Sequence, residues 1–343
     1  MSSFLKVSGM LAAGAAGLAI MAGSAWAGPT LDAVKARDKI LCGIPPSSAG
    51  FAAPDDKGVI RGLDADVCRA VSAAIFGDSE KIEFVSLNTN VRFQALQAGE
   101  VDILSRQTTL TFSRDNSLGL NFGPVVFYDG QGVMVPAKLG VKSALELGGA
   151  AVCILPGTTT QQNLTDYFRT HNIQYESVVF ENSDEWRNAF FSGRCDVLTS
   201  DRSDLASTRA VANNPEEYVV LPETISKEPL APVVRHGDDQ WLDILTWSVH
   251  ALVFAEEKGI TQANVDSFLT SEDPEILRFL GKDGELGAQL GLPNEWAYNI
   301  IKLVGNYGEV FDRNLGPNTK LGLSRGINEQ WTKGGLLYAP PFR

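Results

Sequence analysis

A run of hydrogen-bond donors follows a short apolar stretch in residues 102–114. The sequence there reads DILSRQTTLTFSR, so the apolar pair Ile103 and Leu104 leads directly into hydroxyl, amide and guanidinium side chains. Such donors are costly to bury unless each of them finds a partner. We therefore expect the run to face a group that carries negative charge.

Arg114 ends this run and offers its most specific chemistry. A guanidinium can hold a carboxylate through two parallel N–H···O bonds. The hydroxyl and backbone N–H of Thr109 are close enough in sequence to complete the shell around that carboxylate. The alternative for Arg114 is an ordinary arginine that is exposed to solvent on a loop.

Two other apolar stretches also end in polar residues. PGTTTQ follows the first at residues 156–161, and TSD follows the second at residues 199–201. A helix that begins at about Thr159 presents free N–H groups that suit an anion, although plain capping by a threonine explains the same residues equally well. Asp201 can only accept hydrogen bonds and suits an ammonium group, although a lone aspartate also serves as a cap or turn residue. A carboxylate clamp and an ammonium acceptor together describe the zwitterion of an α-amino acid.

An internal repeat indicates which elements position these residues. ALQAGEVDILS at residues 95–105 and AFFSGRCDVLTS at residues 189–200 share one pattern at an offset of 94 residues. In each copy a helix is expected to end at a glycine, Gly99 or Gly193, which suits the left-handed conformation after a helix. A short strand then follows, as in the second half of a βαβ unit.

A second repeat extends the pattern to two complete lobes. LCGIP at residues 41–45 and VCILP at residues 152–156 are short apolar strands that end at proline. Each is followed by an amphipathic helix, from about Asp64 and from about Thr159. Alternating strands and helices predict mostly parallel sheets flanked by helices, with ligands bound beyond the carboxyl ends of the strands. The three polar stretches are therefore expected to face one cleft.

The predicted fold is thus a two-lobed α/β protein whose lobes are joined by two chain crossings. We expect the crossings near residues 125–133 and 221–233. This divides the chain into a first lobe of residues 28–127 and 231–343, including a C-terminal extension, and a second lobe of residues 128–230. Ligand bonds to both lobes would favour the closed arrangement.

Composition narrows the class of protein further. Residues 1–27 carry one lysine, no acid, an apolar Ala/Gly/Leu stretch and an Ala-Trp-Ala site, which predicts a cleaved signal peptide and a periplasmic protein. The alternative to a signal peptide is a membrane anchor, but the apolar stretch is short for one. A formal net charge of −12 disfavours nucleic acid and anionic lipid as partners. Three dispersed histidines and no CxxC motif predict no metal and no cofactor.

Four cysteines in an exported chain favour disulfides. The repeated strands place Cys42 with Cys68 in the first lobe and Cys153 with Cys195 in the second. We therefore predict the bridges Cys42–Cys68 and Cys153–Cys195. Free buried thiols are the alternative.

Together these motifs resemble a known family. GLDADVCRAV, ALQAGEVDILSRQTTLTFSR, NFGPVVFY, ILPGTTTQ and SGRCDVLTSD, in this order between about residues 39 and 254, are similar to the family 3 extracellular solute-binding proteins of polar amino-acid ABC importers. The tail motifs VGNYGEVFDRNLGPNT and QWTKGG resemble the longer subgroup that serves general L-amino-acid or Glu/Gln/Asp/Asn uptake.

The resemblance implies a shell around the ligand's common groups that consists of Arg114, Thr109, Gln107, Thr158, Thr159 and Asp201. Arg114 and Thr109 would bind the α-carboxylate, and Asp201 would receive the α-ammonium. Thr158 and Thr159 would assist from the second lobe.

The resemblance also bears on selectivity. Pro45 stands where binders of basic amino acids carry an acid, and Thr89 or Ser48 stands where they stack aromatic rings. Arg92 resembles the arginine that reads the side chain in glutamate/aspartate binders, and Arg106 lies beside the cleft. The alternative for Arg92 is an exposed residue in the first turn of a helix.

The function implied is capture of L-amino acids, polar and acidic or of broad range, by a monomer that closes about its hinge. The implied partners are an inner-membrane ABC permease and its ATPase. No catalytic residues are expected, because no Ser-His-Asp or Cys-His set is suggested. A dehydratase-like periplasmic enzyme on the same fold is the alternative.

Overall fold

Five strands form the first sheet, in the order β4-β1-β5-β14-β6. The computed structural model describes residues 28–343, so the predicted signal peptide lies outside the described residues. The strands are β1 (Ile40–Ile44), β4 (Ile82–Ser86), β5 (Ile103–Leu104), β6 (Leu120–Phe122) and β14 (Val233–Arg235). The accompanying elements are the ribbon β2 (Ala53–Pro54) and β3 (Ile60–Arg61), and the helices α1 (Pro29–Arg37), α2 (Leu63–Phe76), α3 (Arg92–Ala98) and α4 (Phe112–Ser117). We call this part the first lobe.

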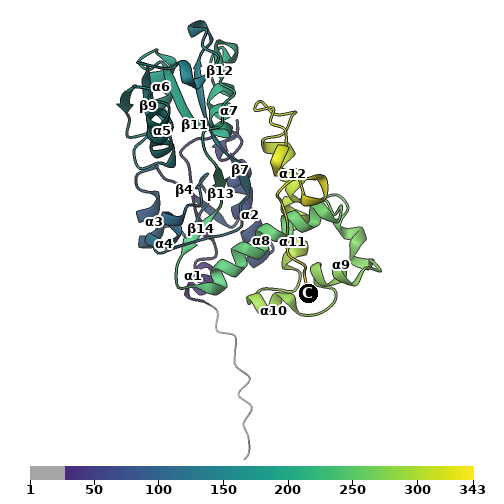
Figure 1. Ribbon diagram of the computed structural model, residues 1–343. Coiled ribbons are helices and arrows are strands. Elements are labelled where there is room, and N and C mark those ends of the chain that lie inside the picture. Colours follow the sequence, from purple (N-terminus) through teal and green to yellow (C-terminus); the bar gives the residue numbers. More distant parts are fainter. Residues whose placement is uncertain (1–27) are drawn as a thin grey trace, which may run out of the picture.

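The second lobe repeats this arrangement around a sheet of order β10-β9-β11-β8-β12. Its strands are β8 (Gln131–Pro136), β9 (Ala151–Ile154), β10 (Glu176–Val179), β11 (Val197–Asp201) and β12 (Tyr218–Val220). Its helices are α5 (Thr159–Thr170), α6 (Ser183–Phe191) and α7 (Arg202–Ala210), with the 3₁₀ turns η1 (Ala137–Leu139), η2 (Ala144–Glu146) and η3 (Pro215–Glu217). Figure 1 shows the second lobe above the first.

The sequence repeat corresponds to this repeated architecture. In each sheet three strands are parallel, and the fourth strand in order, β14 or β8, runs against its neighbours. Both β14 and β8 are the first sheet strands after a crossing between the lobes, which explains the reversal. Gly99 and Gly193 have φ values of 78° and 77°, as the C-terminal cap positions predicted.

Two short strands cross between the lobes. They are β7 (Phe127–Asp129) and β13 (Glu228–Leu230), which pair antiparallel. Both lie inside the stretches predicted for the crossings. The predicted lobe boundaries at residues 127/128 and 230/231 fall in or directly after these strands.

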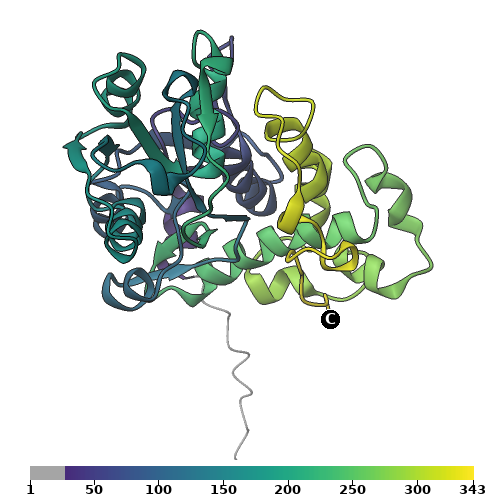
Figure 2. The same ribbon diagram turned by 45° about the horizontal axis from the view of Figure 1, so that its top comes forward.

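The C-terminal extension forms a helical layer beside the two lobes, which Figures 1 and 2 show in green to yellow. It contains α8 (Asp239–Glu257), η4 (Val265–Thr270), α9 (Pro274–Phe279), α10 (Leu286–Leu290), α11 (Trp296–Val304), α12 (Tyr307–Asn314), η5 (Gly326–Asn328) and η6 (Trp331–Lys333). Helices α8, α11 and α12 pack on α2. The helix predicted from about Asp64 is α2. All its residues but Phe76 are buried, because the extension packs against it as well.

Both predicted disulfides are confirmed. Cys42–Cys68 joins β1 to α2 with a Cα–Cα distance of 6.4 Å, and Cys153–Cys195 joins β9 to the turn before β11 at 5.7 Å. Each bridge ties the second strand in the order of its sheet to a neighbouring element of the same lobe. Among residues 28–343, no helix has both the length and the apolar character needed to cross a bilayer.

Candidate ligand-binding site between the lobes

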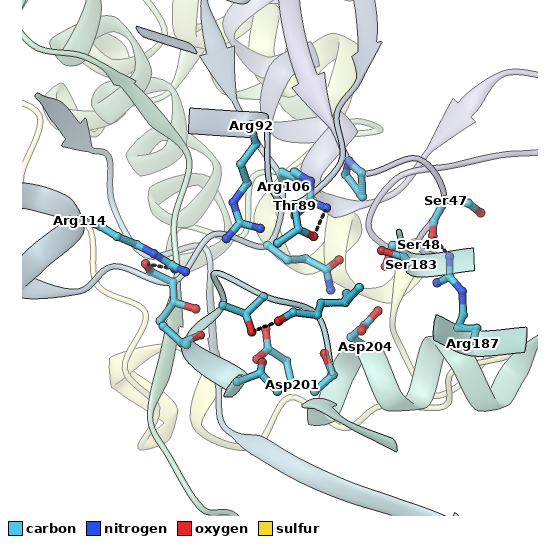
Figure 3. Close-up of a pocket in the computed structure, with 18 residues that line it drawn as sticks. Ser47, Ser48, Thr89, Arg92, Arg106, Arg114, Ser183, Arg187, Asp201 and Asp204 are labelled. Atoms are coloured by element: carbon cyan, nitrogen blue, oxygen red, sulfur yellow. Dashed lines mark hydrogen bonds between the residues drawn. The ribbon is translucent and has the colours of Figure 1, made fainter. Parts of the chain in front are cut away.

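A cavity of about 80 Å³ lies between the two lobes, at the carboxyl ends of β1, β5, β9 and β11. All nine residues predicted for the ligand site line it: Ser48, Arg92, Arg106, Gln107, Thr109, Arg114, Thr158, Thr159 and Asp201. In Figure 3 the arginines of the first lobe and the aspartates of the second reach toward the cavity from opposite sides. The strand-end argument accounts for those that belong to the three polar stretches, whereas Ser48 and Arg92 were predicted from the family resemblance.

Arg114 is held in α4 by two local contacts. Thr111 caps this helix by accepting a hydrogen bond from the Arg114 backbone N–H, and Arg114 Nη1 donates to the Thr109 carbonyl at 2.9 Å. The guanidinium lies 5.3 Å from the centre of the Phe93 ring. Arg114 is only 8% exposed, and burial lowers its pKa. The alternative of a solvent-exposed loop arginine was wrong.

Arg92 is the least compensated charge in the cavity. It begins α3, is 5% exposed, and lies over the same Phe93 ring at 4.7 Å. Within residues 28–343 it makes no hydrogen bond or ion pair, and its buried Nε has no partner. Burial first, and then the charges of Arg106 and Arg114, hold its pKa well below the usual value. The alternative of an exposed first-turn residue was wrong.

Arg106 differs from Arg92 because the protein already binds two of its nitrogen atoms. Its Nε donates to the Leu87 carbonyl at 2.7 Å and its Nη2 donates to Thr89 Oγ1 at 2.9 Å. Burial lowers its pKa to about 10, while the charges of Asp204 and Asp64 act in the opposite direction. Arg106 is therefore a fixed cation on the cavity wall.

Gln107 has a positive φ of 42°, which turns the chain sharply after Arg106. Its backbone N–H donates to Asp64 Oδ2 at 3.1 Å, and Ser105 donates to Asp64 Oδ1 at 3.1 Å. Burial raises the pKa of Asp64 to about 7. The Gln107 Nε2 atom is buried without a partner in the described chain, so this amide remains available to a ligand.

At the start of α5, the threonines both cap the helix and leave backbone N–H groups free for an anion, the two roles considered from the sequence. Thr158 caps the helix: its hydroxyl accepts from the Gln161 N–H at 3.0 Å and donates to the Leu155 carbonyl at 2.8 Å. The backbone N–H groups of Thr159 and Thr160 donate to nothing in residues 28–343, as expected for a first helical turn. The capping side chain and the anion-binding backbone therefore coexist.

Asp201 ends β11 and precedes α7, but its carboxylate caps nothing. It is 8% exposed. Burial first, and then the carboxylates of Asp129, Glu228 and Asp204, raise its pKa well above the usual value. Such a carboxylate is stabilised by a cation placed in the cavity.

Sequence reasoning missed several residues of the site. Ser183 and Arg187 reach the cavity from α6, and Asp204 reaches it from α7. Their spacings, i, i+4 within α6 and i, i+3 from Asp201, are the signals that could have placed them on cavity-facing helix surfaces. Glu228 was also missed, and it lies just behind the cavity wall.

The two lobes touch across the mouth of the cavity. Arg187 Nη2 donates to the Ser47 carbonyl at 3.1 Å, and Ser207 Oγ donates to the Ala49 carbonyl at 2.6 Å. Figure 3 shows the Arg187–Ser47 contact beside the cavity. Bonds between the lobes thus hold the two walls of the cavity together. Within residues 28–343, no three His, Cys, Asp or Glu side chains are grouped to hold a metal ion.

Comparison with known proteins decides the family. Residues 40–261 match the bacterial extracellular solute-binding proteins, family 3. The chain belongs to this family. It is 55% identical over 334 residues to the general L-amino acid-binding periplasmic protein AapJ of Rhizobium johnstonii, covering 97% of this chain and 98% of that protein. It is 52% identical to the glutamate/glutamine/aspartate/asparagine-binding protein BztA of Rhodobacter capsulatus, covering 96% and 98%.

Two solved structures share the fold of this chain. An ABC transporter periplasmic binding protein from Brucella ovis with glutathione bound is 50% identical, with a TM-score of 0.90, and the match covers 92% of this chain and 99% of that chain. A cysteine-binding protein from Campylobacter jejuni, 23% identical, with 72% of this chain and 96% of that chain covered, shares the fold at a TM-score of 0.59. The predicted family and the predicted two-lobed fold are both confirmed.

Proposed function

We propose that this protein captures L-amino acids between its lobes and delivers them to an ABC importer. The observation that carries the proposal is a cavity between the lobes with a buried guanidinium, Arg114, on one wall and a buried carboxylate, Asp201, on the other. Neither group has a counter-ion of its own in an ion pair among residues 28–343. A zwitterion supplies both missing charges at once.

The ligand's common groups fit the free donors and acceptors. Arg114 has nitrogen atoms left for the α-carboxylate, and the backbone N–H groups of Thr109 and Thr159 have no partner in the described chain. Asp201 would accept from the α-ammonium. Charge-assisted bonds of this kind are about twice as strong as neutral ones.

The remaining cavity groups would bind the ligand's side chain. Arg92, Arg106 and the free amide of Gln107 offer donors, with Ser48 as a further hydroxyl. We propose that polar and acidic side chains are preferred over Lys and Arg, whose cations would face these guanidinium groups. The general L-amino acid and Glu/Gln/Asp/Asn relatives are consistent with either a narrow polar range or a broad one.

Ligand capture becomes transport through closure. We propose that residues 28–127 with 231–343, and residues 128–230, move as two bodies about β7 and β13. Bonds to Arg114 on one body and Asp201 on the other would be made together only in the closed form, which an inner-membrane permease with its ATPase recognises. The protein would act as a monomer in the periplasm, after removal of residues 1–27.

A ligand panel tests this function. The protein is unfolded and refolded to remove ligand carried through purification, and the twenty amino acids and glutathione are then titrated by calorimetry. We expect saturable binding of polar or acidic amino acids, and Arg114→Ala should abolish it without lowering the folded content. Mass spectrometry of the incubated ligand separates the enzyme alternative: unchanged ligand supports a binder, and a new product supports an enzyme. Absence of binding by every amino acid would overturn the proposal.

A further inference from the structure

Glu228 has four hydrogen-bond donors around one buried carboxylate. It is 1% exposed. Its Oε2 accepts from Thr109 Oγ1 at 2.6 Å and from Thr159 Oγ1 at 3.0 Å. Its Oε1 accepts from Ser226 Oγ at 2.6 Å and from Asn163 Nδ2 at 2.7 Å. A carboxylate offers about four acceptor positions, so Glu228 is saturated by the protein.

The four donors belong to different parts of the molecule. Thr109 is part of the first lobe, while Thr159 and Asn163 lie in the first turns of α5 in the second lobe. Glu228 itself begins the crossing strand β13. Backbone bonds from Leu110 to Pro229 and from Ala231 to Thr108 fix the first-lobe segment beside that strand. One carboxylate at the hinge therefore joins both walls of the cavity.

These bonds set the chemical role of the two threonine hydroxyls. A hydroxyl has one proton, and both Thr109 and Thr159 give theirs to Glu228. Toward the cavity each hydroxyl can then act only as an acceptor, while the backbone N–H groups of the same two residues remain donors. The same two residues thus present donors to an anion and acceptors to a cation.

We propose that Glu228 is a positioning residue of the ligand site: it orients the hydroxyls of Thr109 and Thr159 as acceptors for the ligand's ammonium group and joins the two lobes on the hinge side of the closed cavity. It does not touch the ligand. This inference rests on the proposed function, because the ammonium belongs to the amino-acid ligand.

The variant Glu228→Gln tests the inference, because it keeps the shape but replaces one acceptor oxygen by an NH₂ donor. The single amide oxygen cannot accept from all four donors, and it holds the threonine hydroxyls less firmly than a carboxylate does, because charge-assisted hydrogen bonds are about twice as strong as neutral ones. We expect the affinity for the best amino acid of the panel to fall at least roughly tenfold by calorimetry. Glu223→Gln, which alters a carboxylate bound to Ser143 away from the cavity, is the matched control and should leave affinity unchanged.

A double-mutant cycle shows whether Glu228 acts through the threonines. In a Thr159→Val background the loss caused by Glu228→Gln should shrink, because partners in one network are not additive. Equal losses in both backgrounds, or no loss in the wild-type background, would overturn the inference.

Circular dichroism checks that each variant is folded, and Glu228→Asp, which keeps the charge but shortens the reach, replaces Glu228→Gln if the latter does not fold. If wild-type protein binds no amino acid, the proposed function and this inference both fail; binding by wild type with an unaffected Glu228→Gln removes the inference alone.

Discussion

Buried charges of both signs give the cavity its chemistry. Arg92, Arg106 and Arg114 come from the first lobe, and Asp201 and Asp204 come from the end of β11 and the start of α7. A buried charge without a partner costs several kcal/mol. Arg106 is partly satisfied by the protein, but Arg92 has no partner in the described chain. Arg92 is therefore free to bind a negatively charged ligand side chain, which a cavity that binds only the common zwitterion would not need.

Replacing Arg92 by methionine should change selectivity more than general affinity. If Arg92 meets an acidic side chain, Glu and Asp should bind roughly 10- to 100-fold more weakly, since a charge-assisted hydrogen bond contributes about 1.5–3 kcal/mol. Ala and Ser should be almost unaffected in calorimetry. Arg61→Met, which alters an exposed arginine paired with Asp55, is the control. Equal losses for all ligands would place Arg92 at the common carboxylate, and tightest binding of Lys or Arg would contradict the polar and acidic preference.

Binding should also depend on pH through Asp201. With the lobes together and no ligand between them, burial and then the carboxylates of Asp129, Glu228 and Asp204 raise its pKa, against the weaker effect of Arg114. The ligand's ammonium favours the ionised carboxylate and lowers that pKa again. In the pH range between the lowered and the raised pKa, binding must release a proton, so affinity falls as pH falls through the raised value.

Proton release is measured by calorimetry in buffers of different ionisation enthalpy. Wild type should release a proton on binding within that pH range, and Asp201→Asn should release none while binding every α-amino acid more weakly. Proton release that persists in Asp201→Asn would assign the titration to another group. A loss confined to one ligand class would show that Asp201 does not meet the common ammonium.

Site residues that directly follow a strand could be predicted from the sequence. Site residues that reach the cavity only through pairing of segments far apart in the chain could not. Arg114, Thr109 and Asp201 could be placed together because the carboxyl ends of parallel strands share an edge. Glu228 could not, because its role depends on the pairing of β13 with the segment at Thr108–Leu110. That pairing joins residues more than a hundred positions apart, and no local pattern records it. Arg187 depends in the same way on the closing of the lobes.

At the scale of elements, the hinge is a small sheet of its own. Strand β13 pairs with β7 on one edge and with residues 108–110 on the other. Tyr128 of β7 stands opposite Pro229. The N–H and carbonyl of Tyr128 are bound by the side chain of Asn328, at 2.6 and 3.0 Å. The C-terminal extension therefore covers the outer edge of the hinge.

Asn328→Ala should loosen this edge. The substitution leaves a peptide group without its partner, at a cost of about 1–3 kcal/mol, so the Tyr128 amide should exchange its hydrogen roughly tenfold faster or more. Exchange is measured by NMR or mass spectrometry of the free protein. Asn294→Ala, a partly buried position in the same extension whose side chain bonds to the Gly284 carbonyl, should leave that amide unchanged. Unaltered exchange in Asn328→Ala would show that the extension does not support the hinge.

The extension also buries α2 well beyond its apolar stripe. Asp66 of this helix accepts hydrogen bonds from Arg313 at 2.7 and 3.0 Å and from Asn314 at 2.7 Å. Periodicity shows which residues are apolar, but it does not show that a polar residue is buried against partners nearly 250 positions away. The disulfide pairs were easier, because each connects neighbouring elements of one repeat.

At the scale of the whole molecule, closure links these features. On the hinge side, Glu228 lies between the lobes and accepts hydrogen bonds from both. At the mouth, Arg187 donates to Ser47 and Ser207 donates to Ala49. The mouth bonds join backbone carbonyls of one lobe to side chains of the other. Ser207 and Ala49 do not line the cavity, so their bond should stabilise the closed form by the same amount whatever amino acid is bound.

Ser207→Ala tests that expectation, because it removes one mouth bond of 2.6 Å and leaves the ligand shell unchanged. A hydrogen bond contributes about 0.5–1.5 kcal/mol, and a smaller closed fraction reduces apparent affinity in proportion. We therefore expect calorimetry to show an affinity about two- to tenfold weaker for every ligand, with their order unchanged, and small-angle X-ray scattering to show a lower closed fraction at subsaturating ligand. Thr170→Ala, which removes a hydroxyl bonded only within α5, should change neither. A loss limited to some ligands would mean that Ser207 contributes to the ligand pocket, and unchanged affinity would mean that the bond adds nothing to closure.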